Sequence, residues 1–146
     1  MLGVKYMYKS KTNIRVRYVE TDQMGIVHHS NYYVYFEVAR EDFIKGAGIE
    51  YRKMEAEGIM MPLIETHCRY YEAARYYDEL EIETYMSEMS AVKVIIEYIV
   101  KRKNDGALIA KGKTVQAFVD SSTFKVMNLK KINNALWNKM KSLMEE

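Results

Sequence analysis

The segment TDQMGIVHHSNYYVYFEVAREDFIK, residues 21–45, joins a polar loop to an unusually apolar helix. In the helical part, the only charge before Arg40 is Glu37. An ordinary surface helix would carry a continuous polar face. The pattern therefore predicts a helix over about 31–45 that ends near Gly46 and is enclosed by the rest of the fold.

The residues on both sides of this segment predict strands. Upstream, apolar and basic residues alternate over about 12–20, with the period of two that is typical of a strand with one buried face. The turn Asn104-Asp105-Gly106 is a strong hairpin signal. Downstream, we expect a short helix over about 50–57, strands over about 63–71, 80–88, 92–102 and 108–120, an edge strand over about 125–129, and a terminal helix from about 132.

These elements predict an α+β protein in which an antiparallel curved sheet wraps around one long central helix. No repeat, low-complexity tract or linker divides the chain. Its 146 residues are enough for one hydrophobic core without metal or disulfide staples. We therefore expect a single domain over residues 1–146.

The composition excludes several classes of partner. The 22 basic and 20 acidic residues give a formal charge of +2, too even a balance for non-specific binding of nucleic acid. No apolar run approaches the roughly 20 residues that cross a bilayer, so we expect no membrane insertion. Cys68 is the single cysteine and the N-terminus lacks the apolar core of a signal peptide, which favours the cytoplasm. Three histidines and one cysteine without a close pair predict no metal site.

The segment that opens the helix has the parts of an acyl-transfer site. That chemistry needs a carboxylate near a carbonyl carbon and donors for the oxygen that becomes negative. Asp22 supplies the carboxylate. The first turn of a helix supplies backbone N–H groups that are unpaired and lie at the positive end of its dipole.

The motifs in this segment resemble one known family. Glu20-Thr21-Asp22, Gly25-Ile26-Val27, a His-x-x-Tyr element at His29 and the run Phe36-Glu37-Val38-Ala39-Arg40 occur in one register. Together they resemble the 4-hydroxybenzoyl-CoA thioesterase-type family of hotdog proteins, and the Tol-Pal-associated acyl-CoA thioesterase branch looks most similar. The resemblance covers about residues 12–130.

This resemblance implies a hotdog fold and hydrolysis of acyl-CoA thioesters without a cofactor. It also implies homodimers or homotetramers whose sites are shared between subunits. By the same resemblance, Asp22 is the catalytic carboxylate, and the backbone N–H of His29 helps to hold the carbonyl oxygen. The candidate oxyanion and substrate-binding residues are Gly25, Ile26, Val27, His29, Ser30, Asn31, Tyr32 and Glu37.

The residues leave several roles open. Asp22 either attacks the thioester directly or activates water. The His29 ring either positions water or the thioester, or only fills the mouth of the site. We expect His28 to point elsewhere and to be non-catalytic, and His67 and Cys68 to be structural.

Three further polar residues near the site also have two interpretations each. Glu20 either shares the face of the catalytic carboxylate or is a solvated loop acid. Glu37 either pairs with Arg40 or contacts the acyl group. Ser30 or Asn31 is expected to cap the helix, and Asn31 also to steady the loop.

Thirteen tyrosines are many for this length. They either pack at core edges and subunit interfaces or line an acyl pocket, because tyrosine has an apolar body with a polar tip. A stacking platform for single strands would need a basic groove that the composition does not indicate. The clusters are Tyr32, Tyr33 and Tyr35, and then Tyr70, Tyr71, Tyr76 and Tyr77.

One departure from the family concerns the CoA nucleotide. The arginines that bind the CoA phosphates in some members, just after the third strand, are replaced here by Ser90, Ala91 and Val92. The nucleotide site therefore stays open, and an acyl-carrier protein is an alternative carrier. A hotdog hydratase or dehydratase and a non-catalytic acyl-CoA binding module are the alternative functions. Basic residues that are candidates for the nucleotide are Lys93, Lys101, Arg102, Lys103, Lys125, Lys130 and Lys131.

Overall fold

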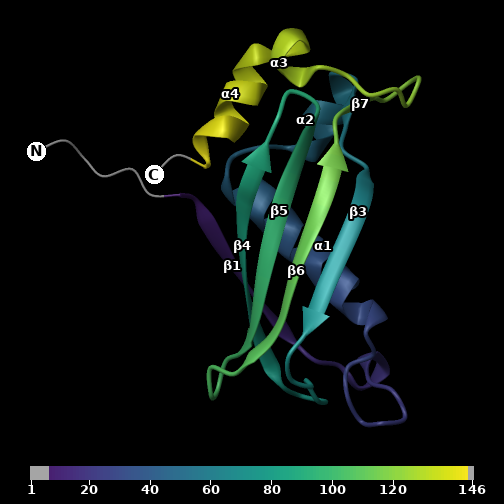
Figure 1. Ribbon diagram of the computed structural model, residues 1–146, viewed down its shortest axis with the longest axis vertical. Coiled ribbons are helices and arrows are strands. Elements are labelled where there is room, and N and C mark those ends of the chain that lie inside the picture. The colour runs from purple at the N-terminus through teal and green to yellow at the C-terminus, as the bar shows by residue number, and fades with distance from the viewer. Residues whose placement is uncertain (1–6, 145–146) are drawn as a thin grey trace, which may run out of the picture.

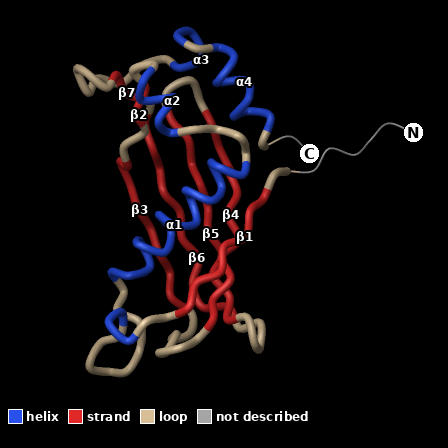
Figure 2. Tube along the Cα trace, turned by 180° about the vertical axis from the view of Figure 1, so that it is seen from behind, coloured by secondary structure: helices blue, strands red, loops and turns tan. Residues whose placement is uncertain are grey.

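A five-stranded antiparallel sheet packs against one long helix, α1 (Ser30–Gly46), in the computed structural model, which describes residues 7–144 (Figure 1). The strand order in the sheet is β1-β4-β5-β6-β3. Figure 2 shows α1 lying across one face of this sheet, which we call the inner face. The strands are β1 (Lys9–Arg15), β3 (Leu63–Tyr70), β4 (Glu79–Met89), β5 (Lys93–Arg102) and β6 (Leu108–Ala117).

The smaller elements lie at one end of the sheet (Figure 1). There, β2 pairs with β7 in a two-stranded antiparallel sheet. The apolar residues of the sheet and helices form one buried cluster. The elements are α2 (Tyr51–Ala56), β2 (Ile59–Met60), β7 (Val119–Asp120), α3 (Leu129–Ile132) and α4 (Asn134–Ser142).

The inner side of α1 forms the centre of the core. The ring of Phe36 stacks on Tyr98 of β5 with centroids 4.5 Å apart and an interplanar angle of 14°. Gly112 of β6 lies opposite Tyr98, and a methyl group there would overlap the Phe36 ring. The buried residues of α1 recur with helical spacing and are Tyr32, Tyr35, Phe36, Ala39, Arg40, Phe43 and Ile44.

The prediction that α1 is enclosed on all sides is wrong for the single chain. Tyr33, Val34 and Val38 are 37%, 50% and 41% exposed. They lie on the side of the helix that faces away from the sheet, because one sheet can cover only one side of a helix. The helix therefore presents an apolar stripe that nothing in the chain covers within residues 7–144.

The strand predicted over about 12–20 is wrong at both ends, because β1 covers Lys9–Arg15 and a 3-10 helix occupies Tyr18–Glu20. The physical reason is the side chain of Glu20. Its Oε1 accepts the backbone N–H of Arg17 at 2.7 Å, which turns the chain out of the strand. The remaining strand pairs with β4 over the whole of β1.

The C-terminal half also departs from prediction in two places. The strand expected over about 108–120 is broken at Phe118. The part before the break, β6, pairs with β3 and β5, whereas the part after it, β7, pairs with β2. The edge strand expected over about 125–129 is wrong, because Val126 makes only an isolated bridge and Asn128 caps α3. The terminal helix is present as α4, and the short helix predicted over about 50–57 is present as α2.

Candidate active site

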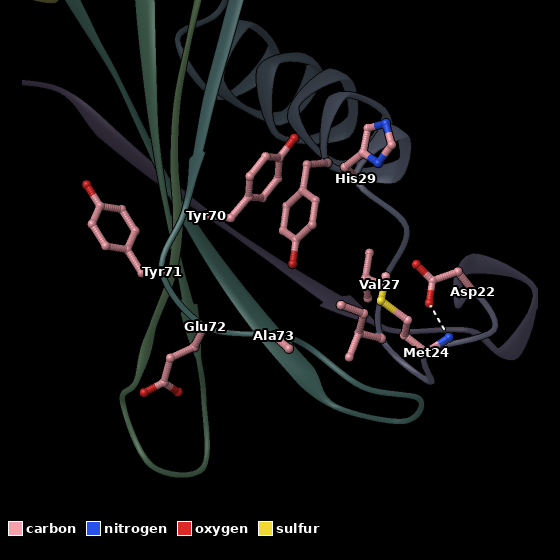
Figure 3. Close-up of a pocket in the computed structure, with 10 residues that line it drawn as sticks. Asp22, Met24, Val27, His29, Tyr70, Tyr71, Glu72 and Ala73 are labelled. Atoms are coloured by element: carbon pink, nitrogen blue, oxygen red, sulfur yellow. Dashed lines mark hydrogen bonds between the residues drawn. The ribbon is translucent and has the colours of Figure 1, made fainter.

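A cavity of about 330 Å³ opens beside the N-terminal end of α1 (Figure 3). One wall is the loop that precedes α1, and the other is the end of β3 with the residues that follow it. These two walls are about fifty positions apart in the sequence, so the cavity exists only in the folded chain. The lining residues are Asp22, Met24, Ile26, Val27, His29, Tyr32, Tyr70, Tyr71, Glu72 and Ala73.

Asp22 lies in a tight turn that leaves part of its carboxylate free. Its Oδ1 accepts the backbone N–H of Met24 at 2.8 Å, and its carbonyl accepts the N–H of Gly25 at 2.9 Å. Gly25 has φ +78°, a conformation that glycine adopts without strain. The second carboxylate oxygen, Oδ2, accepts no hydrogen bond from any residue between 7 and 144. One oxygen therefore orients the group while the other stays available.

Glu20 holds this loop against the helix. It is 5% exposed, and its Oε1 accepts the hydroxyl of Tyr35 at 3.0 Å in addition to the N–H of Arg17. Its backbone carbonyl accepts His28 N–H at 2.9 Å and Asn31 Nδ2 at 2.8 Å. Burial and the hydrogen bond to the Glu20 carboxylate raise the pKa of Tyr35 well above its usual value. Both sequence interpretations of Glu20 are therefore wrong, since the group is buried and structural.

The start of α1 leaves one backbone donor free at the cavity. Ser30 N–H is bound by His28 Nδ1 at 3.2 Å, and the Ser30 hydroxyl lies 2.7 Å from the same nitrogen. The backbone N–H of His29 makes no hydrogen bond within the part of the chain that the structure describes. An unpaired N–H at a helix start is a ready donor for a developing negative charge.

The helix start also corrects two predictions. Neither Ser30 nor Asn31 caps α1 with its side chain; the His28 ring accepts the first N–H instead, and Asn31 steadies the loop through Glu20. His28 does not point away from His29. Their ring centroids are 4.1 Å apart and the rings are inclined by 31°.

Aromatic side chains form the apolar part of the cavity. Tyr32 of α1 and Tyr70 of β3 meet edge to face with centroids 5.2 Å apart. Burial, followed by the neighbouring Cys68, raises the pKa of Tyr32 to about 12, so its hydroxyl stays neutral. In Figure 3, Tyr70 points toward the helix and Tyr71 away from it. Of the clustered tyrosines, Tyr32, Tyr70 and Tyr71 line the cavity, and an acyl pocket stays a prediction for them.

The cavity brings together some of the predicted residues and leaves others out. Glu37 is exposed on α1. Within residues 7–144 it makes no ion pair with Arg40, which instead donates to the Tyr98 hydroxyl at 3.2 Å. The predicted residues at the cavity are Asp22, Ile26, Val27, His29 and Tyr32, whereas Gly25, Ser30, Asn31 and Glu37 do not line it. Met24, Glu72 and Ala73 also line the cavity and were not predicted from the sequence, whereas Tyr70 and Tyr71 were predicted only as members of a tyrosine cluster.

Within residues 7–144, no group of three His, Cys, Asp or Glu side chains lies close enough to hold a metal ion. No helix in the same range has both the length and the apolar character needed to span a bilayer.

The chain is similar in sequence to known proteins. The model of the thioesterase-like superfamily matches residues 16–136. The chain belongs to this superfamily. YneP of Bacillus subtilis, a protein named for acyl-CoA thioesterase activity, is 34% identical over 125 residues, which are 86% of this chain and 90% of YneP. The acyl-CoA thioester hydrolase YbgC of Escherichia coli is 29% identical over 92 residues, 62% of this chain and 69% of YbgC.

Solved structures agree with the fold. The DHNA-CoA thioesterase of Staphylococcus aureus superimposes with a TM-score of 0.86 at 30% identity, covering 92% of this chain and 90% of that one. A protein of Thermus thermophilus superimposes with a TM-score of 0.83 at 34% identity, covering 95% and 100%. The predicted α+β class and hotdog fold are confirmed.

Proposed function

We propose that this chain hydrolyses acyl-CoA thioesters at the cavity beside α1, with the Asp22 carboxylate and the His29 backbone N–H as the reacting and stabilising groups. The proteins it resembles are named as acyl-CoA thioesterases or thioester hydrolases, and it is an enzyme of that class. One observation carries the assignment of residues. A carboxylate oxygen of Asp22 and the backbone N–H of His29, neither of which has a partner among residues 7–144, border the same cavity.

Two reaction routes fit this arrangement. In one, an Asp22 oxygen attacks the carbonyl carbon, the C–S bond breaks to release CoA thiolate, and water then opens the mixed anhydride. In the other, Asp22 takes a proton from a water molecule whose oxygen attacks the same carbon, and the thiolate leaves with a proton. Both routes consume one water and yield a carboxylic acid and a thiol. In both, the His29 N–H stabilises the oxygen that becomes negative.

The His29 ring is the third group at the reacting end. It is exposed at the mouth, where it is available to orient water or the thioester. Beyond it, Tyr32 and Tyr70 provide an apolar wall for the acyl group. The side of the cavity lined by these rings therefore receives the acyl chain, and the CoA portion extends outward.

We include a homodimer or homotetramer in this proposal. The apolar stripe of Tyr33, Val34 and Val38 is uncovered, and β3 is an edge strand whose residues are exposed along most of its length. An uncovered apolar stripe beside an open sheet edge is a surface that a second copy can cover. The reaction needs no cofactor and takes place in the cytoplasm in this account. The motifs between Glu20 and Tyr32 support the Tol-Pal-associated branch.

A substrate comparison tests the proposed reaction. Purified protein is incubated with a saturated acyl-CoA and with its 2-enoyl counterpart, and free thiol is measured alongside hydration of the double bond. The proposal expects thiol from both esters and no hydration. Hydration without thiol release would favour a hydratase. Tight binding of acyl-CoA without either product would favour a binding module. An acyl-carrier protein thioester that is cleaved faster than the CoA ester would change the carrier and not the chemistry.

A further inference from the structure

Arg75 is an exposed cation beside the cavity, and its guanidinium makes no ion pair or hydrogen bond within residues 7–144. Its backbone bridges Ile26, which lines the cavity. Its Nη1 lies 3.8 Å from the position that a Cβ would take at Gly25, so the guanidinium reaches over the turn that carries Asp22.

Three acids, Glu72, Asp78 and Asp105, do not neutralise Arg75, because Arg102 binds them. Arg102 donates to Asp78 at 3.2 Å and to Asp105 at 2.8 Å, and it lies 3.7 Å from Glu72. Arg102 is one of the basic residues that the sequence analysis considered for the nucleotide, but its donors are occupied. The contact between Asp78 and Arg75 involves the Arg75 backbone N–H, at 2.9 Å, and not its guanidinium.

Exposed aromatic rings lie beside Arg75. Tyr76 is 55% exposed and Tyr18 is 76% exposed, and the two rings meet edge to face with centroids 5.7 Å apart. Tyr77 holds the turn with φ +72°, a conformation that costs a tyrosine free energy, and its carbonyl is bound by Arg15 Nη1 at 3.0 Å. Arg75, whose guanidinium has no partner within residues 7–144, thus lies next to an exposed pair of rings, Tyr76 of the same turn and Tyr18 of the 3-10 helix.

The turn Ser90-Ala91-Val92, where the family resemblance would place the CoA phosphates, is far from this cavity within one chain. Ser90, Ala91 and Val92 follow the end of β4, whereas Ala73 and Arg75 precede its start. The eleven residues of β4 separate the two positions by about 35 Å. The turn at Ser90 also carries no cation in its own three residues.

We propose that Arg75 and the Tyr18–Tyr76 pair receive the 3′-phospho-ADP end of CoA. The guanidinium binds a phosphate through paired N–H donors, and the adenine stacks on a tyrosine face. This inference rests on the proposed acyl-CoA hydrolysis, because it names where the leaving portion of that substrate is held. Ligands with a phosphate but no adenine, such as 4′-phosphopantetheine, would use Arg75 alone.

The test compares three thioesters of one acyl group, carried on pantetheine, on 4′-phosphopantetheine and on CoA. Arg75→Gln is expected to lower the ratio of kcat/KM for the CoA ester to that for the pantetheine ester about tenfold to a hundredfold, through KM. Tyr76→Leu is expected to lower the ratio of the CoA ester to the phosphopantetheine ester severalfold. Arg52→Gln, an exposed arginine on α2, is the matched control and should leave both ratios unchanged.

The result that would overturn the inference is an Arg75→Gln variant whose three esters all slow by the same factor, or a wild type that cleaves all three equally. A phosphate effect at Arg75 without any adenine effect at Tyr76 would overturn the nucleotide assignment and indicate a phosphopantetheine carrier. Calorimetric titration with adenosine 3′,5′-bisphosphate keeps the two proposals separate. Binding that is lost in Arg75→Gln, in a protein that cleaves no thioester, would support the nucleotide site and refute the hydrolysis.

Discussion

Replacement of Gly112 by alanine tests the packing that positions α1. A Cβ added at Gly112 would overlap Cε2 and Cζ of Phe36 and lie 3.1 Å from the carbonyl oxygen of His67. The ring cannot move aside, because Phe36 is 0% exposed and is stacked on Tyr98. Helix and sheet must therefore separate.

Overpacking of a core usually costs about 1–3 kcal/mol. A rigid ring on one side and a strand backbone on the other put Gly112→Ala at the upper end, about 3 kcal/mol. The equilibrium constant for folding should fall about a hundredfold. The melting temperature should fall by about 6–12 °C for a chain of this size.

The assay is urea unfolding followed by far-UV circular dichroism, with two controls. Gly106→Ala, where φ is +70° and nothing lies within 4 Å, should lose only the roughly 1 kcal/mol of backbone strain. In a Phe36→Leu background, Gly112→Ala should cost less than about 1 kcal/mol, because the ring that it meets is gone. Equal costs in the two backgrounds, or an unchanged midpoint in the wild-type background, would refute this explanation of Gly112.

Three further predictions concern the loop, acid stability and assembly. Glu20→Gln should lower the free energy of unfolding by about 1–2 kcal/mol and slow thiol release, because the charged contact that fixes the loop to Arg17 is lost. Urea unfolding and a thiol-release assay measure the two effects, and a variant with full activity would contradict the prediction. The pKa of Asp120 is lowered, first by the backbone N–H of Thr123, so its carboxylate stabilises the fold above about pH 4 and this contribution is lost as the pH falls through the lowered pKa. As the pH is lowered from about 5 to about 2, the range of this titration, the free energy of unfolding should therefore fall less in Asp120→Asn than in the wild type. Plots of unfolding free energy against pH that run parallel for the two proteins would argue against this. Val38→Glu should shift the protein to monomers in analytical ultracentrifugation, because it puts a charge on the apolar stripe of α1; an unchanged sedimentation coefficient would remove that stripe from the interface.

The extent to which the fold was predictable depends on the range of the contacts. The helix over about 31–45 and the hairpin at Asn104-Asp105-Gly106 were predicted well, because periodicity and turn chemistry are local signals. The end of β1 was not, because the decisive contact is a side chain of Glu20 that returns to the Arg17 backbone and outweighs an alternating pattern. The break at Phe118 depends on pairing between β2 and β7, which no local pattern specifies.

The site divides in the same way. Residues of the loop before α1 could be proposed from sequence, because they lie together and carry recognisable chemistry. Tyr70 and Ala73 could not be placed with them, since they come from another part of the chain and only the paired sheet brings them to the cavity. Arg75 was missed for a related reason. An exposed arginine in a turn is informative only when its distance from Gly25 and its lack of a partner are known.

Thiol release by Asp22→Asn is the most direct test of the account. The substitution keeps the size of the side chain and its acceptor for Met24 N–H, but removes the negative charge that faces the cavity. Asp120→Asn, the same chemical change at the β7 end of the molecule, is the control. The account predicts that kcat/KM for an acyl-CoA falls about 10²–10⁴-fold in Asp22→Asn, with a normal melting temperature, and stays near the wild-type value in Asp120→Asn. An Asp22→Asn protein that releases thiol at the wild-type rate would contradict it.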